Sequence, residues 1–324
     1  MSAARGWRDE RALDGPLQIV EDDIPALNML FSEAFTERYR KDGMVSVRVP
    51  GLNPQMWKYA IADAARGAVL WRTADGDIAA FNLVHVSGTE GWMGPLAVAS
   101  AYQGRGAGKT VVTHGVGWLK ARNARVIGLE TMPRTMDNIG FYSSLDFVPG
   151  PLTITLSLPS ALGATRVVEL SRMTEEQRDS AISQCADLLG ALCPGYDFTR
   201  ELRLTHELGL GDTVLSYTGS ELRAFALCHS APLVEGRERE EMRVLKLVAR
   251  DDDAFARIVM ELASYARKIG TRTMSVRVQG AYATAYRTLV AQGARIRWTD
   301  LRMTAAGYAE TVPHSGVVLS NWEI

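Results

Sequence analysis

Apolar and polar positions along this chain follow the same order twice. Residues 78–85 read Ile-Ala-Ala-Phe-Asn-Leu-Val-His and residues 222–229 read Leu-Arg-Ala-Phe-Ala-Leu-Cys-His, so Ala, Phe, Leu and His recur at an offset of 144 residues. Apolar runs flank the turn-forming pairs 75–76 (Asp-Gly) and 219–220 (Gly-Ser), which predicts a β-hairpin in each half. A repeat of this length indicates a duplicated domain, because solenoid units are much shorter.

Each half is predicted to contain the same succession of elements. Apolar residues recur at three- and four-residue spacing over 24–35 and 174–189, which predicts an early helix in each half. A meander of strands, a helix, a strand, a second helix and a last strand are expected to follow. A break is expected at 158–163, where proline and glycine follow a strand-like run. We therefore expect an N-terminal extension over 1–15, a first domain over 16–159 and a second domain over 160–324.

A glycine-rich loop in the first half carries the strongest chemical signal. The apolar run 93–98 leads into Gln-Gly-Arg-Gly-Ala-Gly at 103–108, and apolar residues at helical spacing follow. A loop between a strand and a helix start directs backbone N–H groups at one point, where the helix dipole adds positive charge. Glycine lets the backbone approach a ligand closely and adopt positive φ angles. The loop therefore predicts a ligand that bears a phosphate or pyrophosphate, and an ordinary strand-to-helix turn is the simpler alternative.

Two phosphate-binding patterns fit this loop in part or in full. The P-loop of nucleoside triphosphatases reads G-x-x-x-x-G-K-[ST], and Gly108, Lys109 and Thr110 match its end. Its first glycine would fall on Gln103, however, and we find no convincing apolar strand ending in Asp for the magnesium side. The pattern Q/R-x-x-G-x-G/A is met in full by Gln103, Gly106 and Gly108. The second pattern is therefore the better fit.

A further motif downstream agrees with this second pattern. Residues 141–147 read Phe-Tyr-Ser-Ser-Leu-Asp-Phe and match [L/F]-Y-x-x-x-G-F, except that Asp146 stands where glycine is usual. The loop and this motif together resemble the GNAT acyltransferases, the superfamily named for its N-acetyltransferases, over about 60 residues. Two other positions depart from the family pattern, since Thr135 replaces its usual Asn and Asn138 stands where Ala is usual.

The resemblance and the duplication imply a tandem two-domain GNAT protein of the α+β class, each half a mixed, twisted sheet flanked by helices. The resemblance also implies acetyl-CoA as co-substrate, bound between the strands at 96–98 and 126–132, and no metal. The pantetheine arm would pair with the backbone near Val98, and the amides of 103–108 would hold the pyrophosphate. The expected cofactor-binding residues are Leu96, Val98, Gln103, Gly104, Arg105, Gly106, Ala107, Gly108, Lys109, Asn138 and Tyr142.

Acetyl transfer to an amine needs a proton donor for the departing thiolate and a base for the amine. By resemblance, Tyr142 is the expected acid. The base is left open among Glu90 on the loop strand, Glu130 on the neighbouring strand, His85 and a chain of water molecules. His85 recurs as His229 in the half without the loop, which favours a structural role for it. The expected catalytic residues are therefore Tyr142, Glu90 and Glu130.

By resemblance, the acceptor is expected to bind along residues 36–57, after the first helix. Arginine and lysine at 38, 40, 41 and 48 suit an acceptor with a carboxylate or phosphate group, although a solvated loop explains them equally well. The predicted function is direct transfer of an acetyl group to an amine of a small molecule or peptide, in a ternary complex. The alternatives are a non-catalytic acyl-CoA-binding or regulatory protein and, third, a P-loop ATPase.

The second half lacks the glycine loop. At the equivalent position, residues 250–253 read Arg-Asp-Asp-Asp, and three carboxylates suit a helix N-terminus but repel a pyrophosphate. We therefore expect no CoA in the second half, and a solvated helix start rather than a metal site. The apolar C-terminal run 317–324 is expected to dock as a strand or a plug, across the seam between the halves.

Composition limits the remaining classes. The 324 residues carry a formal net charge of −1, which argues against nucleic acid and membrane partners. Cys185, Cys193 and Cys228 fit neither a disulfide framework nor a zinc motif. The first residues lack the apolar core of a signal peptide. We therefore expect a cytoplasmic protein, either monomeric or homodimeric.

Overall fold

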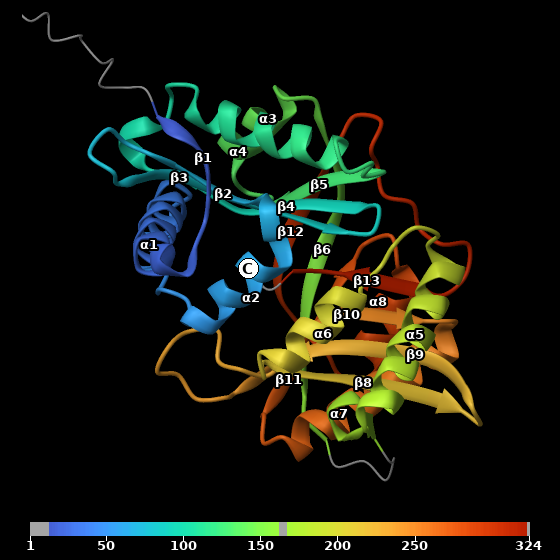
Figure 1. Cartoon of the computed structure of the whole chain (residues 1–324). Helices are drawn as coiled ribbons and strands as arrows, with labels where there is room; N and C mark the ends of the chain where they lie inside the picture. The colour runs from blue at the N-terminus through green and yellow to red at the C-terminus, as the bar shows by residue number, and fades with distance from the viewer. Residues whose placement is uncertain (1–12, 162–166, 323–324) are drawn as a thin grey trace, which may run out of the picture.

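A computed structural model describes residues 13–161 and 167–322. In this part of the chain the two halves repeat one order of elements, as the sequence pattern predicts (Figure 1). The first half comprises β1 (Asp14–Gln18), α1 (Ile24–Lys41), α2 (Pro54–Ala64), β2 (Ala68–Arg72), β3 (Ile78–Ser87), β4 (Glu90–Val98), α3 (Ala107–Lys120), β5 (Val126–Thr131), α4 (Met136–Ser143) and β6 (Phe147–Pro159). The second half comprises β7 (Val168–Glu169), α5 (Glu175–Leu192), α6 (Thr199–Glu207), β8 (Gly211–Thr218), β9 (Glu221–His229), β10 (Glu241–Ala249), α7 (Asp252–Lys268), β11 (Thr273–Gln279), α8 (Ala283–Ala291), β12 (Arg295–Ala305) and β13 (Val317–Ser320). The predicted extension 1–15 and the predicted break at 158–163 lie partly outside the described residues.

One mixed sheet of thirteen strands runs through both halves of the described chain. Its order is β1-β2-β3-β4-β5-β12-β6-β11-β10-β9-β8-β7, and β13 pairs with β10 off this path. The last strands of the halves are exchanged, since β12 lies between β5 and β6, and β6 pairs with β11. The two sheets expected from the sequence are therefore continuous. The exchange also places side chains of the second half beside β5.

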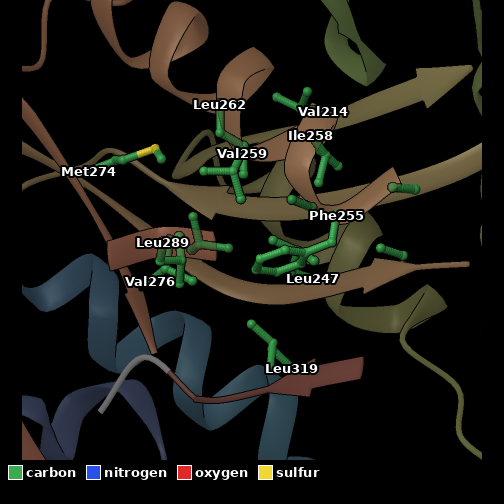
Figure 2. Packing of buried hydrophobic residues seen from close by; sticks show 14 of the residues in the cluster. Val214, Leu247, Phe255, Ile258, Val259, Leu262, Met274, Val276, Leu289 and Leu319 are labelled. Atoms are coloured by element: carbon green, nitrogen blue, oxygen red, sulfur yellow. The ribbon is translucent and has the colours of Figure 1, made fainter. Parts of the chain in front are cut away.

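Helices cover both faces of the sheet in each half. In the first half, Leu27 of α1 and Trp57 of α2 are buried on one face, and Leu119 of α3 is buried on the other. In the second half, Phe255 of α7 packs beside Leu247 of β10 in a cluster of aliphatic side chains (Figure 2). Burial of these apolar side chains is the main favourable contribution to the stability of the fold.

The structure bears on the cysteines and on membrane-spanning helices. The three cysteines are buried and unpaired, in keeping with packed thiols. Within residues 13–161 and 167–322, no helix combines the length and the apolar character that crossing a bilayer requires.

The C-terminal strand closes a gap in the sheet of the second half. The parallel pairing of β10 with β11 covers Glu241–Val244 and ends there. Beyond it, β13 pairs antiparallel with residues 246–249 of β10, so it fills the space where β10 and β11 separate. The amide of Asn321 continues the contact by donating to the carbonyl of Leu245 at 2.9 Å. The prediction that the run from 317 docks as a strand is confirmed for Val317–Ser320.

Leu319→Ala is expected to lower the free energy of unfolding by about 2–5 kcal/mol, because it leaves a cavity under a fully packed strand. Leu319 is 1% exposed and packs in the core of the second half (Figure 2). Urea denaturation followed by circular dichroism measures the change. Ile296→Ala on β12, where the side chain is 56% exposed, is the control and should stay within about 0.5 kcal/mol of the wild type. Equal losses in the two variants would contradict a packed role for β13.

Candidate functional site

The glycine loop joins the end of β4 to the start of α3. Gly104 and Gly106 have φ angles of +69° and +89°, and Gly106 is the residue that precedes the first turn of α3. The first N–H groups of α3 have no carbonyl partner inside the helix, and residues 103–106 are exposed. Gln103 braces the loop, because its side-chain amide donates to the carbonyl of Val98 at 2.9 Å. The amide of Gln103 donates to the carbonyl of Ser100 at 3.3 Å, so the loop presents the amides that follow it, together with the positive end of a helix dipole, to an incoming anion.

An open strand edge leads to this loop. The parallel pairing of β4 with β5 ends at Met93, so Leu96 and Val98 pair only with β3 on their other side. In the second half the equivalent residues, Leu247 and Ala249, pair with β13. The same gap is thus filled by protein in the second half, and no strand among the described residues fills it in the first. A strand edge without a partner offers backbone donors and acceptors to an extended ligand.

The second motif lies against the loop helix. A β-carbon on Gly108 of α3 would meet the ring of Phe141 of α4 at 3.2 Å, so glycine permits this close approach. Asn138 donates from its side-chain amide to the hydroxyl of Thr131 at 3.3 Å, which ties α4 to the end of β5. The two motifs that are separated in the sequence therefore meet at the end of the open edge.

Tyr142 is half-buried beside this edge. Its ring lies 5.1 Å from the ring of Phe141 and 6.1 Å from that of Phe147, in an apolar cluster that also contains Leu96 and Met93. Burial raises the pKa of the Tyr142 hydroxyl to about 12. The hydroxyl therefore keeps its proton at neutral pH, which suits a proton donor and not a base.

Glu90 faces the second half and is fully buried. One carboxylate oxygen accepts from Trp92 Nε1 at 3.0 Å, and the other accepts from the Ser320 hydroxyl at 2.7 Å. Lys246 Nζ in turn donates to Ser320 at 2.9 Å, so a buried cation lies close behind. Because Glu90 is fully buried and bonded to groups inside the protein, an acceptor amine cannot reach it, which argues against its expected role as base.

Glu130 lies at the end of β5, among cations of the second half. It accepts hydrogen bonds from Thr153 and Arg277, and its carboxylate lies 3.2 Å from Nε of Arg302. Burial would raise the pKa of Glu130, but Arg277 and Arg302 outweigh this effect and hold the pKa below its usual value. Glu130 is therefore ionised at neutral pH and has little tendency to take a proton, which weakens its expected role as base.

The exchanged strand β12 brings residues to this place that the sequence patterns do not indicate. Asp300 accepts from Arg277 at 2.9 Å and from Nε1 of Trp298 at 3.1 Å. The ring of Trp298 meets that of Tyr39 on α1 edge-to-face at 6.1 Å. Burial and the neighbouring Glu130 raise the pKa of Asp300, although Arg277 opposes them. Only knowledge that β12 pairs with β5 would have drawn attention to Asp300.

The predicted acceptor segment lies against the turn between β5 and α4. Arg38 pairs with Asp42 at 2.6 Å and with Asp137 of α4 at 3.3 Å, and Arg134 donates to the carbonyl of Asp42 at 2.8 Å. Arg40 pairs with an acidic neighbour on its own helix at 2.9 Å. Two of the four basic residues that suggested an anionic acceptor thus already have carboxylate partners.

The acidic run of the second half forms a helix cap. Asp251 accepts from the amide of Ala254 at 2.8 Å and pairs with Arg223, while Asp252 and Asp253 occupy the first turn of α7. This arrangement is the solvated helix start that the sequence indicated. Within the described residues, no group of three or more potential metal ligands is present.

Comparison with known proteins agrees with this geometry. Residues 26–147 match the acetyltransferase (GNAT) family. The whole chain is similar in structure to a putative acetyltransferase from Pyrococcus horikoshii, with 16% identity, a TM-score of 0.67 and coverage of 94% of this chain and 93% of that one. It is also similar to a tandem GNAT protein from the clavulanic acid biosynthesis pathway, with 10% identity, a TM-score of 0.59 and coverage of 93% and 100%. The N-myristoyltransferase of Saccharomyces cerevisiae, with bound myristoyl-CoA, matches with 9% identity, a TM-score of 0.60 and coverage of 93% and 83%.

No curated protein sequence matches the chain. At identities of 9–16%, the solved structures establish the fold alone. The family match concerns residues 26–147, which lie in the first half. Taken with the glycine loop, the open strand edge and the second motif, they show that residues 26–147 match the GNAT family and that the chain has the fold of tandem two-domain GNAT proteins.

Proposed function

We propose that the chain transfers an acetyl group from acetyl-CoA to the amine of a small molecule or peptide, with both substrates bound together. The observation that carries this proposal is the open edge at residues 96–98, which ends at a glycine loop with free amides. The second half supports it by contrast, because its equivalent edge is filled by β13 and its helix start is acidic. One cofactor site per chain is therefore expected.

The proposed cofactor position follows from these features. The amide groups of pantetheine pair with the backbone of Leu96 and Val98, and the pyrophosphate binds at the amides of residues 103–108. Arg105 and Lys109 are exposed beside the loop, where they can reach further phosphate oxygens. The thioester then lies near Tyr142, at the inner end of the open edge.

The proposed chemistry needs one acid and one base. The amine attacks the thioester carbonyl, the carbon–sulfur bond breaks, and Tyr142 gives its proton to the departing thiolate. We assign the base role to Asp300, because its raised pKa and its 17% exposed side chain suit proton uptake better than the settings of Glu90 and Glu130. The proton lost by the amine thus passes to Asp300.

The aromatic rings beside Asp300 favour a cationic acceptor. Trp298 and Tyr39 lie at the end of α1, whereas Arg277 and Arg302 already balance the charges of Glu130 and Asp300. An ammonium group is attracted to the faces of aromatic rings. A primary amine that is protonated in solution therefore fits this place.

The alternative function is acyl-CoA binding without catalysis. Glu90 is bonded to groups inside the protein and Glu130 is weakly basic. A catalytic base is therefore left to a single carboxylate, Asp300, and a chain without a working base would bind acyl-CoA and not turn it over. The two functions differ in turnover and not in cofactor binding.

The function is tested by calorimetric titration of acetyl-CoA, followed by a screen of primary amines for release of free CoA. Saturation at one site per chain and release of CoA with at least one amine are the expected results. Binding without turnover over a broad amine panel would favour the alternative function. Binding of ATP with magnesium, without binding of acetyl-CoA, would overturn the acyltransferase proposal and favour a P-loop ATPase.

Asp300→Asn is expected to lower kcat about 100-fold at pH 7, because the amide cannot accept the proton of the amine. The pKa of Asp300 is raised, so in the wild type activity is lost as the pH falls through that pKa. The variant should lack this acidic limb in its pH–rate profile. Asp137→Asn, at a side chain that is 81% exposed on α4, is the control and should keep full activity. An unchanged kcat in Asp300→Asn would exclude Asp300 as the base.

A further inference from the structure

The kink of β4 at Gly94 marks the inner end of the open edge. The pairing of β4 with β5 ends at Met93, and the register of β4 with β3 shifts between Asn82 and Val84. Gly94 has a φ angle of +144°, a conformation that favours glycine. If acetyl-CoA binds as proposed above, its acyl group lies at this kink, so the position of the Gly94 peptide matters to the reaction.

His85 on β3 holds this kink from a buried position. Its Nδ1 lies 2.7 Å from a carboxylate oxygen of Asp63, and its Nε2 lies 3.1 Å from the carbonyl oxygen of Gly94. The side chains of His85 and Asp63 are 3% and 0% exposed. Water therefore does not compete for the contact between His85 and Asp63.

Both partners of the imidazole are hydrogen-bond acceptors. A neutral imidazole donates from one nitrogen only, and its other nitrogen would then direct a lone pair at an oxygen atom. The doubly protonated ring donates from both nitrogens and satisfies both contacts. We propose that His85 is held as an imidazolium between Asp63 and Gly94, and that it is a positioning residue for the kink at which the acyl group binds.

The second half completes this arrangement. Arg200 of α6 donates to the other oxygen of Asp63 from Nε at 3.1 Å and from Nη2 at 2.8 Å, and Nη2 also reaches the carbonyl of Val86 at 2.9 Å. Asp63 is thus one buried carboxylate between two cations. Removal of the carboxylate deprives both cations of the anion between them, which is costly inside the protein. Contacts thus run from Arg200 through Asp63 and His85 to Gly94. Through Arg200, the second half helps to fix the shape of the proposed cofactor site in the first half.

Other charged groups face the same cluster. Glu201 of α6 accepts from the hydroxyl of Ser87 and lies 4.0 Å from Arg200. Burial, with a contribution from Asp63, raises the pKa of Glu201 to about 7. The charge of Lys246 on β10 also favours the ionised form of Asp63. Burial lowers the pKa of Lys246 itself. The ring of Trp322 lies 6.2 Å from the ring of His85. The charge of His85 is therefore measured on its own ring nitrogens.

The charge of His85 is tested by nitrogen NMR on protein labelled with ¹⁵N-histidine. At pH 7 we expect one buried histidine with protons on both ring nitrogens, and its signals should be absent from His85→Gln. In Asp63→Asn the ring should become neutral. One protonated and one bare nitrogen on His85 in the wild type would overturn the proposal. This readout does not depend on enzymatic activity, so it stands whether or not the proposed function holds.

The positioning role is tested by kinetics with two variants of α6. Arg200→Met should lower kcat about tenfold or more, with the Kd of acetyl-CoA nearly unchanged, because small displacements at a reacting centre reduce rates strongly. Arg203→Met is the matched control, since Arg203 is half exposed and pairs with Asp179 at 3.6 Å. Equal kcat in the two variants would overturn the positioning role.

Failure of the wild type to bind acetyl-CoA would refute the proposed function alone, because the NMR result concerns the protein without ligand.

Discussion

Gly106→Glu is expected to weaken the binding of acetyl-CoA by about 100-fold or more. Gly106 has a φ angle of +89°, and a side chain in this conformation costs about 1–2 kcal/mol. The new carboxylate would also stand at the N-terminus of α3, where the proposed pyrophosphate binds and where negative charge is drawn by the helix dipole. Relief of this strain would displace the loop amides, and since each 1.4 kcal/mol is roughly a tenfold change in affinity, the displacement and the charge repulsion together account for the expected loss.

Gly76→Glu is the matched control for this experiment. Gly76 has a φ angle of +92° in the turn between β2 and β3, and like Gly106 it has open space where a β-carbon would stand. The variant therefore carries the same strain and the same charge, away from the loop. Calorimetry should show acetyl-CoA binding to Gly76→Glu as to the wild type. Equal losses would assign the effect to backbone strain, and full binding by Gly106→Glu would place the cofactor elsewhere.

Tyr142→Phe is expected to lower kcat by about 100-fold, with the Kd of acetyl-CoA nearly unchanged. The phenylalanine ring keeps the packing against Phe141 and Phe147, so only the proton donor is lost. The leaving thiolate would then have to take its proton from water. Steady-state kinetics with the best amine of the screen, together with calorimetry, separate turnover from binding.

The pH dependence gives an independent check on Tyr142. An acid acts in its protonated form, which persists below its pKa, and burial raises the pKa of Tyr142 to about 12 from its ordinary value of about 10. Titration of Tyr142 should therefore cause no loss of activity below about pH 10. An alkaline limb below that value which disappears in Tyr142→Phe would contradict the assignment.

Tyr286→Phe serves as the control for the variant. Tyr286 is the counterpart of Tyr142 at the repeat offset of 144 residues, and it lies on α8 against the core of the second half. Removal of its hydroxyl should leave kcat unchanged. A similar loss in both variants would indicate a general effect on folding rather than loss of a proton donor.

Local sequence patterns account for the parts of the site that are contiguous in the chain. The strand, the glycine loop and the helix start follow one another within residues 90–120, and the positive φ angles of Gly104 and Gly106 are those that glycine permits. The repeated order of elements was also predictable, because apolar periodicity reflects which face of each helix or strand is buried. For the same reason the C-terminal strand was recognised by its apolar run.

The duplication, the glycine loop, the second motif and the docking of the C-terminal run were thus determined by the sequence itself. The exchange of β6 and β12 was decided only by the tertiary structure, because pairing between strands from different halves leaves no local periodicity. That exchange brings Arg277 and Asp300 to Glu130, and so it sets which carboxylate can take a proton. The charge of His85 depends in the same way on Asp63, whose side chain meets it only in the folded protein. A pKa or a protonation state is a property of the surroundings of a group, and those surroundings are assembled from residues far apart in the chain.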